Sequence, residues 1–240
     1  MMQFRSFAET DIGPRRRTNE DAYVNRPDLG IWAVADGAGG HQAGDVASAM
    51  IRDALETIPT ELDAVTLLAE VRSRVQDVHE SLLAEAEGRG PGTILASTAA
   101  VLLARGEHYA ALWAGDSRIY LLRGGGLCCL THDHSRVQEL LDAGLLRPED
   151  AGMHPDAHLI TRAVGAGDVT LTLEKVLGGI EVGDRFLLCS DGVSKVLTDE
   201  VMAELLQAEG GDAPAARMVH AALENGAKDN VTAVVVDAMQ

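Results

Sequence analysis

The strongest constraint on the fold is an uneven alternation of short strand-like runs with helices that come in pairs. Apolar residues spaced three and four apart predict an amphipathic helix over residues 45–58. Pro59 ends it, and Thr60 is a candidate N-cap for a second, longer helix. Farther along, Thr198 caps a third helix and Pro214 begins a fourth. The strand-like runs are residues 31–35, 97–104, 109–114, 118–122, 185–189 and 231–236. Grouped strands with paired helices predict an α+β fold, in which helical layers cover antiparallel sheets.

The chain shows no internal repeat and no linker rich in proline or serine, so we expect residues 1–240 to form one domain. Residues 97–122 hold three strand-like runs separated by short turns, which predicts an antiparallel meander. Residues 142–168 are rich in glycine, proline and histidine and have weak periodicity. Connections of this length often act as lids. We therefore expect a flap over a site here, with an irregular surface excursion as the alternative.

Charge excludes several classes of partner. The chain has 20 basic and 37 acidic side chains, which gives a formal charge of −17. Such a surface repels both nucleic acid and an anionic membrane. The first residues lack the apolar core of a signal peptide, and no apolar run is long enough to span a bilayer. We therefore expect a cytoplasmic protein, in which the three cysteines stay reduced.

Acidic residues stand at the ends of several predicted strands. They are Asp36, Asp116 and Asp191 after strands, and Glu20, Asp21 and Asp229 before strands. Because the end of one strand lies beside the start of its antiparallel neighbour, these acids can gather at one sheet edge. Carboxylates a few ångströms apart repel one another unless a cation neutralises them. Ligands that are all oxygen favour Mg²⁺ or Mn²⁺ over Zn²⁺. Any one of these acids could be a turn residue or helix cap, but the whole set favours a metal site.

A glycine-rich turn over residues 36–44 connects a strand to a helix and invites a nucleotide-binding interpretation. The spacing argues against it. A dinucleotide fingerprint requires glycine where Gln42 stands, and a phosphate-binding loop requires lysine where Asp45 stands. Glycines here let the backbone approach a metal instead, which makes the Gly37 carbonyl a candidate ligand.

Six short motifs follow one another along the chain. They are residues 13–22 (GPRRRTNEDA), 34–41 (VADGAGGH), 113–118 (WAGDSR), 130–135 (LTHDHS), 189–193 (CSDGV) and 228–232 (KDNVT). In this order they resemble the motifs of the metal-dependent protein phosphatases of type 2C, most closely the bacterial branch. The resemblance runs from about residue 3 to residue 238, which is essentially the whole chain.

The resemblance implies a four-layer αββα sandwich, in which two central antiparallel sheets are flanked by helix pairs. It implies a binuclear Mn²⁺ or Mg²⁺ centre at one edge and hydrolysis of phosphoserine and phosphothreonine in proteins. Asp116 with Asp191 would form the weaker third metal site of bacterial members. Residues 142–168 fall where the family has its variable flap beside the active site.

The resemblance also implies a role for each ligand of the centre. Asp36 would bridge both metal ions, and the Gly37 carbonyl would bind one of them. Asp191 and Asp229 would bind the other ion, and Glu20 would hold metal-bound water.

Arg16, four residues before Glu20, occupies the family's phosphate-binding position, with Arg17 as the fallback. A guanidinium suits this role because its planar fork matches two phosphate oxygens. The alternative is a basic run on a solvated surface. Eukaryotic relatives carry histidine directly after the Asp-Gly pair as a proposed general acid, but this chain has Ala38 there. The group that protonates the leaving group is therefore unassigned.

Histidines near these motifs are expected to be structural. We expect His41 to make a structural hydrogen bond. His132 and His134 flank Asp133, and we expect them to help cap the helix that Ser135 opens rather than to bind metal.

These features together predict direct hydrolysis without a phosphoenzyme. Two cations roughly 3.5–4 Å apart would lower the pKa of a bridging water toward neutrality and yield a hydroxide for in-line attack on phosphorus. Asp36 and Asp191 would hold the ions, and Arg16 would hold the phosphoryl oxygens. The expected partners are phosphorylated proteins and a cognate Ser/Thr kinase in bacterial signalling, and the expected state is a monomer. The alternatives are a metal-dependent nuclease, which the charge disfavours, a small-molecule phosphatase, and a binding module of the same fold without turnover.

Overall fold

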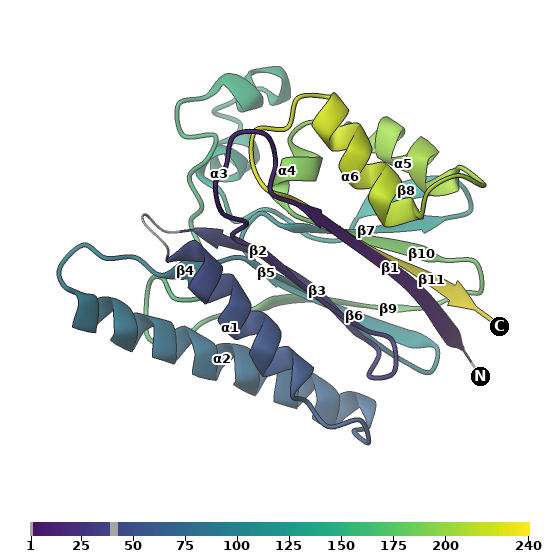
Figure 1. Ribbon diagram of the computed structural model, residues 1–240, viewed down its shortest axis with the longest axis horizontal. Coiled ribbons are helices and arrows are strands. Elements are labelled where there is room, and N and C mark those ends of the chain that lie inside the picture. Colours follow the sequence, from purple (N-terminus) through teal and green to yellow (C-terminus); the bar gives the residue numbers. More distant parts are fainter. Residues whose placement is uncertain (1, 39–42) are drawn as a thin grey trace.

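The computed structural model describes residues 2–38 and 43–240 (Figure 1). The strands are β1 (Gln3–Asp11), β2 (Asp21–Arg26), β3 (Ile31–Ala38), β4 (Ala96–Ser97), β5 (Ala99–Arg105), β6 (His108–Ala114), β7 (Arg118–Arg123), β8 (Gly126–Cys129), β9 (Glu174–Gly179), β10 (Arg185–Cys189) and β11 (Val231–Met239). The α-helices are α1 (Gly44–Glu56), α2 (Ala64–Arg89), α3 (Arg136–Asp142), α4 (Asp191–Ser194), α5 (Asp199–Gln207) and α6 (Pro214–Glu224).

The strands form two antiparallel sheets that stack face to face (Figure 1). The first sheet has the order β1-β11-β10-β7-β8, and the second has the order β2-β3-β5-β6-β9 with β4 paired to β3. Helices α5 and α6 cover the outer face of the first sheet, and α1 and α2 cover the outer face of the second. The predicted αββα sandwich with flanking helix pairs is confirmed.

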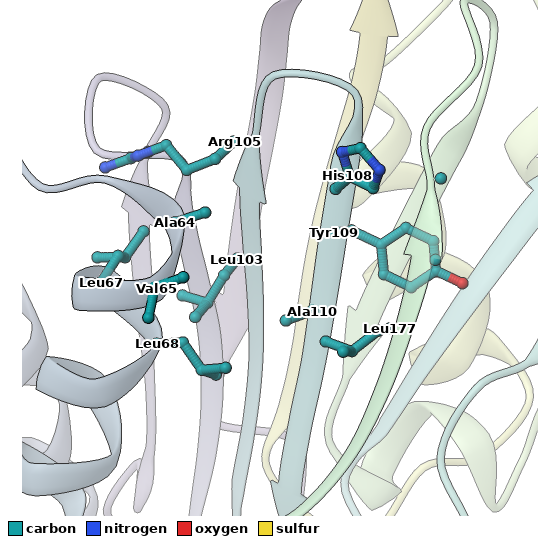
Figure 2. Close-up of a pocket in the computed structure, with 12 residues that line it drawn as sticks. Ala64, Val65, Leu67, Leu68, Leu103, Arg105, His108, Tyr109, Ala110 and Leu177 are labelled. Atoms are coloured by element: carbon teal, nitrogen blue, oxygen red, sulfur yellow. The ribbon is translucent and has the colours of Figure 1, made fainter.

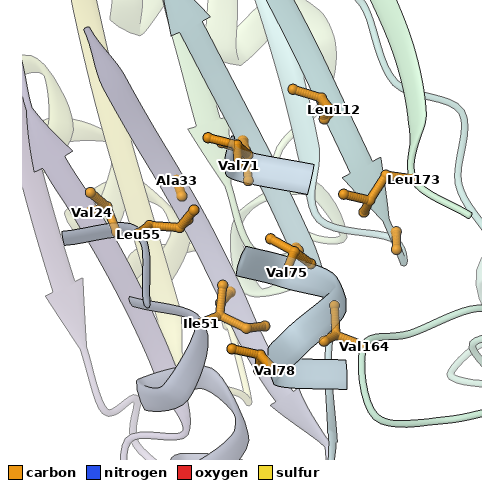
Figure 3. Packing of buried hydrophobic residues seen from close by; sticks show 14 of the residues in the cluster. Val24, Ala33, Ile51, Leu55, Val71, Val75, Val78, Leu112, Val164 and Leu173 are labelled. Carbon is orange, nitrogen blue, oxygen red and sulfur yellow. The ribbon is translucent and has the colours of Figure 1, made fainter. Parts of the chain in front are cut away.

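Three apolar layers hold the sandwich together. Trp32 lies in the layer between the two sheets. In the layer under α1 and α2, Ile51 and Val75 pack toward the second sheet (Figure 3). Met202 and Met218 of α5 and α6 pack on the first sheet. Because both faces of each sheet are covered, most strand residues are apolar.

The predicted helices are present, with one cap misassigned. Helix α2 begins at Ala64, and its N-cap is Asp63, whose side chain accepts the Thr66 N–H at 2.8 Å. The prediction that Thr60 caps this helix is wrong, because a carboxylate three residues nearer to the apolar stripe satisfies the first turn. Thr198 caps α5, and Pro214 begins α6, as predicted. No helix among the described residues combines the length and the apolar character needed to cross a bilayer.

The predicted meander over residues 97–122 is only partly correct. Strands β5 and β6 form an antiparallel pair, but β7 joins the first sheet and pairs with β10. The chain changes sheets at Gly115, whose φ is +111° and where an added Cβ would lie 2.7 Å from the Thr98 Cβ. A residue with a side chain fits neither that dihedral angle nor that space. Spacing along the chain does not distinguish a hairpin from a crossing between stacked sheets.

The predicted flap, residues 142–168, contains little regular structure apart from a 3₁₀ helix over Pro148–Met153. Two isolated β-bridges anchor its later part, one between Ile160 and Ser135 and one between Val164 and Ser97. The segment is therefore attached to the start of α3 and to β4, which pairs with β3 at Gly37, directly after Asp36. Its action as a lid stays a prediction.

Candidate metal centre

Acidic residues from both sheets meet at one end of the sandwich. Asp36 lies inside β3, because the strand continues beyond it; the expectation that the strand ends before the acid is wrong. Asp21 on β2 is its direct partner in the antiparallel register. Asp116 lies in the turn between β6 and β7, and Asp191 begins α4 just after β10. The acids therefore come from both sheets, and Asp116 lies where the chain crosses from β6 in the second sheet to β7 in the first.

The pKa of Asp36 is raised because its side chain is buried and because these acids lie close together. Burial raises the pKa of Asp36 well above its ordinary value, and neighbouring carboxylates raise it further. Those carboxylates belong to Asp21, Asp191, Asp116 and Asp229. The backbone of Asp36 is fixed from the other side, because its N–H donates to Thr98 Oγ1 at 2.9 Å and its carbonyl accepts the Thr98 N–H at 2.8 Å. The backbone at this buried carboxyl group is thus held in a well-defined position.

Gly37 packs against the segments that carry Glu20 and α1. Its N–H donates to the Glu20 carbonyl at 3.0 Å. A Cβ at position 37 would lie 2.1 Å from the Gly44 carbonyl oxygen, so only glycine allows this approach. The close packing brings Glu20 beside the start of α1. His41, for which a structural hydrogen bond was predicted, lies outside the described residues.

Lys195 lies between two of the acids. Its Nζ is 2.5 Å from Asp191 Oδ2 and 3.3 Å from Asp116 Oδ2. Burial opposes the charged ammonium group, but the two carboxylates raise the pKa of Lys195 above its ordinary value. The sequence analysis assigned no role to Lys195. Its position four residues after Asp191 indicates that the two side chains can meet on one helical turn.

Arg16 lies at the same centre and pairs with Asp229. Its Nη2 is 2.5 Å from Asp229 Oδ2, and this hydrogen bond raises the pKa of Arg16. The Arg16 side chain is 46% exposed. The rest of its guanidinium is therefore accessible to a ligand from solvent.

Asn230 holds the loop that carries Arg16 and is a residue to which the sequence motifs gave no role. Its Oδ1 accepts the Glu20 N–H at 2.8 Å, and its Nδ2 donates to the carbonyls of Ile12 and Thr18 at 2.8 and 3.1 Å. The residue is buried, so these bonds are shielded from water. The only signal in the sequence was its place directly after Asp229.

Asp21 is a third residue to which no separate role was given. Ser190 and Thr232 donate hydroxyl hydrogen bonds to its Oδ2 at 2.8 and 2.6 Å. Burial is the main cause that raises the pKa of Asp21 to about 7, and these hydrogen bonds act in the opposite direction. Asp21 is therefore a buried member of the acidic cluster and lies beside Asp36.

The donor set fits hard divalent cations. In the described part of the chain, buried Oδ1 atoms of Asp21, Asp116 and Asp191 have no hydrogen-bond partner, which is unusual for buried polar atoms. Oxygen ligands with excess negative charge are those that Mg²⁺ and Mn²⁺ prefer. Among residues 2–38 and 43–240, no three acidic, histidine or cysteine side chains are already arranged as the ligands of one metal ion. Lys195 and Arg16 instead hold oxygens of three of the acids.

The histidines near the motifs have structural contacts. His134 Nδ1 accepts the Gly115 N–H at 3.1 Å, and His132 pairs with Asp142 at 2.7 Å. The side chain of Ser135 caps α3, so the expectation that the histidines themselves contribute to the cap is wrong. His134 instead supports the turn before Asp116.

Two pockets adjoin the acids, and Lys195 lines both. One, of about 310 Å³, is also lined by Asp116, and the other, of about 650 Å³, is also lined by Asp191 and Asp229. A separate apolar cavity of about 480 Å³ lies between α2 and strands β5, β6 and β9 (Figure 2). Its walls are side chains such as Leu177, and the acids of the centre do not line it. We therefore place the chemistry at the carboxylate end.

Comparison with known proteins gives consistent matches over the whole chain. The family model described as protein phosphatase 2C matches residues 15–230. The serine/threonine protein phosphatase PstP of Mycobacterium tuberculosis is 38% identical over 232 residues, which cover 96% of this chain and 44% of PstP. The chain thus spans less than half the length of that relative.

Two solved structures are similar throughout. PppA, described as a key regulatory component of T6SS in Pseudomonas aeruginosa, has a TM-score of 0.90 and 40% identity, and the match covers 99% of this chain and 98% of PppA. The catalytic domain of PstP, crystallised with two manganese ions, has a TM-score of 0.89 and 35% identity, and the match covers both chains completely.

Proposed function

This chain belongs to the protein phosphatase 2C family, and from that membership we propose that it is a metal-dependent phosphatase of phosphoserine and phosphothreonine in proteins. PstP of Mycobacterium tuberculosis is described as a serine/threonine protein phosphatase, and the catalytic domain of PstP was crystallised with two manganese ions. The observation that carries the proposal is the set of converging carboxylates with buried, unpartnered oxygens beside an exposed arginine.

We propose that the centre holds two Mn²⁺ or Mg²⁺ ions. Asp36, Asp191, Asp229 and the Gly37 carbonyl would be ligands, and Glu20 would hold water. When bound, the ions would neutralise the acids, activate water and polarise the phosphoryl group. The unpartnered Oδ1 atom of Asp191, and the raised pKa of Asp36, support this assignment.

Arg16 is the proposed phosphate-binding group, because its exposed guanidinium lies against a proposed metal ligand. Substrate phosphate would compete with Asp229 for this guanidinium and accept its N–H donors. The remaining proposals follow from the sequence. They are one catalytic domain over residues 1–240 with a flap at residues 142–168, a cognate Ser/Thr kinase, a monomeric state and a cytoplasmic location.

The substrate class is tested by comparing initial rates on phosphoserine and phosphothreonine peptides with rates on nucleotides and bis(p-nitrophenyl) phosphate, all in Mn²⁺. We expect turnover of the monoester peptides and little of the diester, because an acidic surface repels polyanionic nucleic acid. Diester hydrolysis at a kcat/KM equal to that of the peptides would favour the nuclease alternative. Binding of phosphopeptide without any turnover would favour the binding module.

Arg16→Ala is expected to raise KM for a phosphopeptide by about 10- to 100-fold, because a hydrogen bond to a charged group contributes about 1.5–3 kcal/mol. The matched control is Arg17→Ala, which removes the neighbouring exposed guanidinium. Steady-state kinetics with both variants decide the assignment. A normal KM in Arg16→Ala, together with a raised KM in Arg17→Ala, would transfer the phosphate-binding role to Arg17.

A further inference from the structure

The pair of acids that would form a third metal site is already bridged by a side chain of this protein. Asp116 comes from the turn between β6 and β7, whereas Asp191 begins α4. The Lys195 ammonium reaches one oxygen of each carboxylate, at 3.3 and 2.5 Å. Two acids from distant parts of the chain are therefore joined by one intramolecular cation.

The backbone brings Lys195 to this position. Its N–H donates to the Asp191 carbonyl at 2.9 Å, so the two residues lie one helical turn apart. The Asp116 side chain is only 4% exposed and the Asp191 side chain 17% exposed. At such burial a carboxylate pair needs a positive charge, and a lysine ammonium group supplies it with three donors.

A divalent ion and the ammonium group exclude each other here. A divalent ion held by Asp116 and Asp191 would lie close to the Lys195 ammonium group, and two cations so near to one another repel strongly in a partly buried site. The Oδ1 atoms of Asp116 and Asp191 both stay without a hydrogen-bond partner among the described residues. Lys195 therefore contacts one oxygen of each acid and leaves the Oδ1 atom of Asp191 for the two-ion centre.

We propose that Lys195 takes the place of the third divalent ion, so that this phosphatase works with two metal ions and a tethered ammonium group. The inference rests on the proposed function, because it presupposes the two-ion centre. Lys195 is a positioning residue in this proposal: it holds Asp116 and Asp191 at a fixed separation. Substitution of Lys195 is therefore expected to change the number of bound metal ions, and the test measures that number rather than the rate of turnover.

The test is Mn²⁺ stoichiometry, measured by equilibrium dialysis and metal analysis, over concentrations well above saturation of the first two ions. We expect two ions per chain in the wild type and three in Lys195→Met, which has a neutral side chain of similar length. Lys175→Met, which removes the same charge from β9, is the matched control and should keep two. Adding Asp116→Asn to Lys195→Met should return the value to two, because the third ion loses a carboxylate ligand.

Three ions in the wild type would overturn the inference and leave the proposed function intact. Two ions in a folded Lys195→Met would also overturn it. No bound Mn²⁺ in any variant would instead reject the two-ion centre itself. The wild-type stoichiometry can overturn the inference even if Lys195→Met does not fold. Circular dichroism of each variant establishes whether it folds.

Discussion

Asp36→Asn is expected to lower phosphatase activity by about 10³-fold, while the metal-free protein stays at least as stable as the wild type. A metal ion contributes several kcal/mol to the transition state, and each 1.36 kcal/mol corresponds to about tenfold in rate. Asparagine keeps the shape of Asp36 but cannot supply the negative charge that the ions require. Burial and four nearby carboxylates disfavour the charged form of Asp36, so removal of that charge relieves repulsion in the absence of metal.

Hydrolysis of p-nitrophenyl phosphate in Mn²⁺ and thermal unfolding in chelator measure the two effects. Asp77→Asn, the same substitution on an exposed position of α2, is the control and should change neither. Wild-type turnover in Asp36→Asn would refute the metal assignment. A large loss of stability in chelator would show that Asp36 is needed for folding rather than for ion binding.

Mn²⁺ is expected to stabilise the protein substantially, and removal of the ion is expected to abolish activity reversibly. Ions at about 100 times their Kd contribute about 2.7 kcal/mol per site, which corresponds to about 5–10 °C in Tm for a domain of this size. Thermal unfolding with Mn²⁺ and with chelator measures the shift. Asp229→Asn should show a much smaller shift, because a proposed ligand is lost. Full activity in excess chelator would reject the metal mechanism.

The gain in Tm that Mn²⁺ produces is expected to depend on pH. Burial raises the pKa of Asp21 from 3.8 to about 7, so the native metal-free protein binds more protons than the unfolded chain between these values. Its stability therefore falls as pH rises through this window. Metal binding requires deprotonated acids and becomes stronger over the same range. The Mn²⁺-dependent gain in Tm should accordingly grow from about pH 5 to about pH 7, and a gain that shrinks would contradict this account.

Local patterns predicted the helices well, because each signal lies within a few residues. The apolar spacing located α1, and Thr198 and Pro214 marked the starts of α5 and α6. Caps were less certain where two candidates stood close together, as Thr60 and Asp63 do before α2. Either side chain can accept a backbone N–H, and only packing of the apolar face selects one.

The assignment of strands to sheets could not be predicted from such patterns. The run that became β7 looks like the third strand of a meander, yet it pairs with β10 from far along the chain. Periodicity reports which residues face a core but not which strand lies beside them. The crossing at Gly115 depends on the space beside Thr98, which exists only in the folded chain.

The sequence by itself determined the chemical type of the centre, because six ordered motifs supply acidic oxygen ligands and an arginine. Only the tertiary structure decided how these charges are paired. Arg16 meets Asp229 and Lys195 meets Asp116 across long stretches of chain. Such contacts depend on how two sheets stack, and the free energy that orders them comes from the apolar layers between and around the sheets rather than from the charged residues themselves.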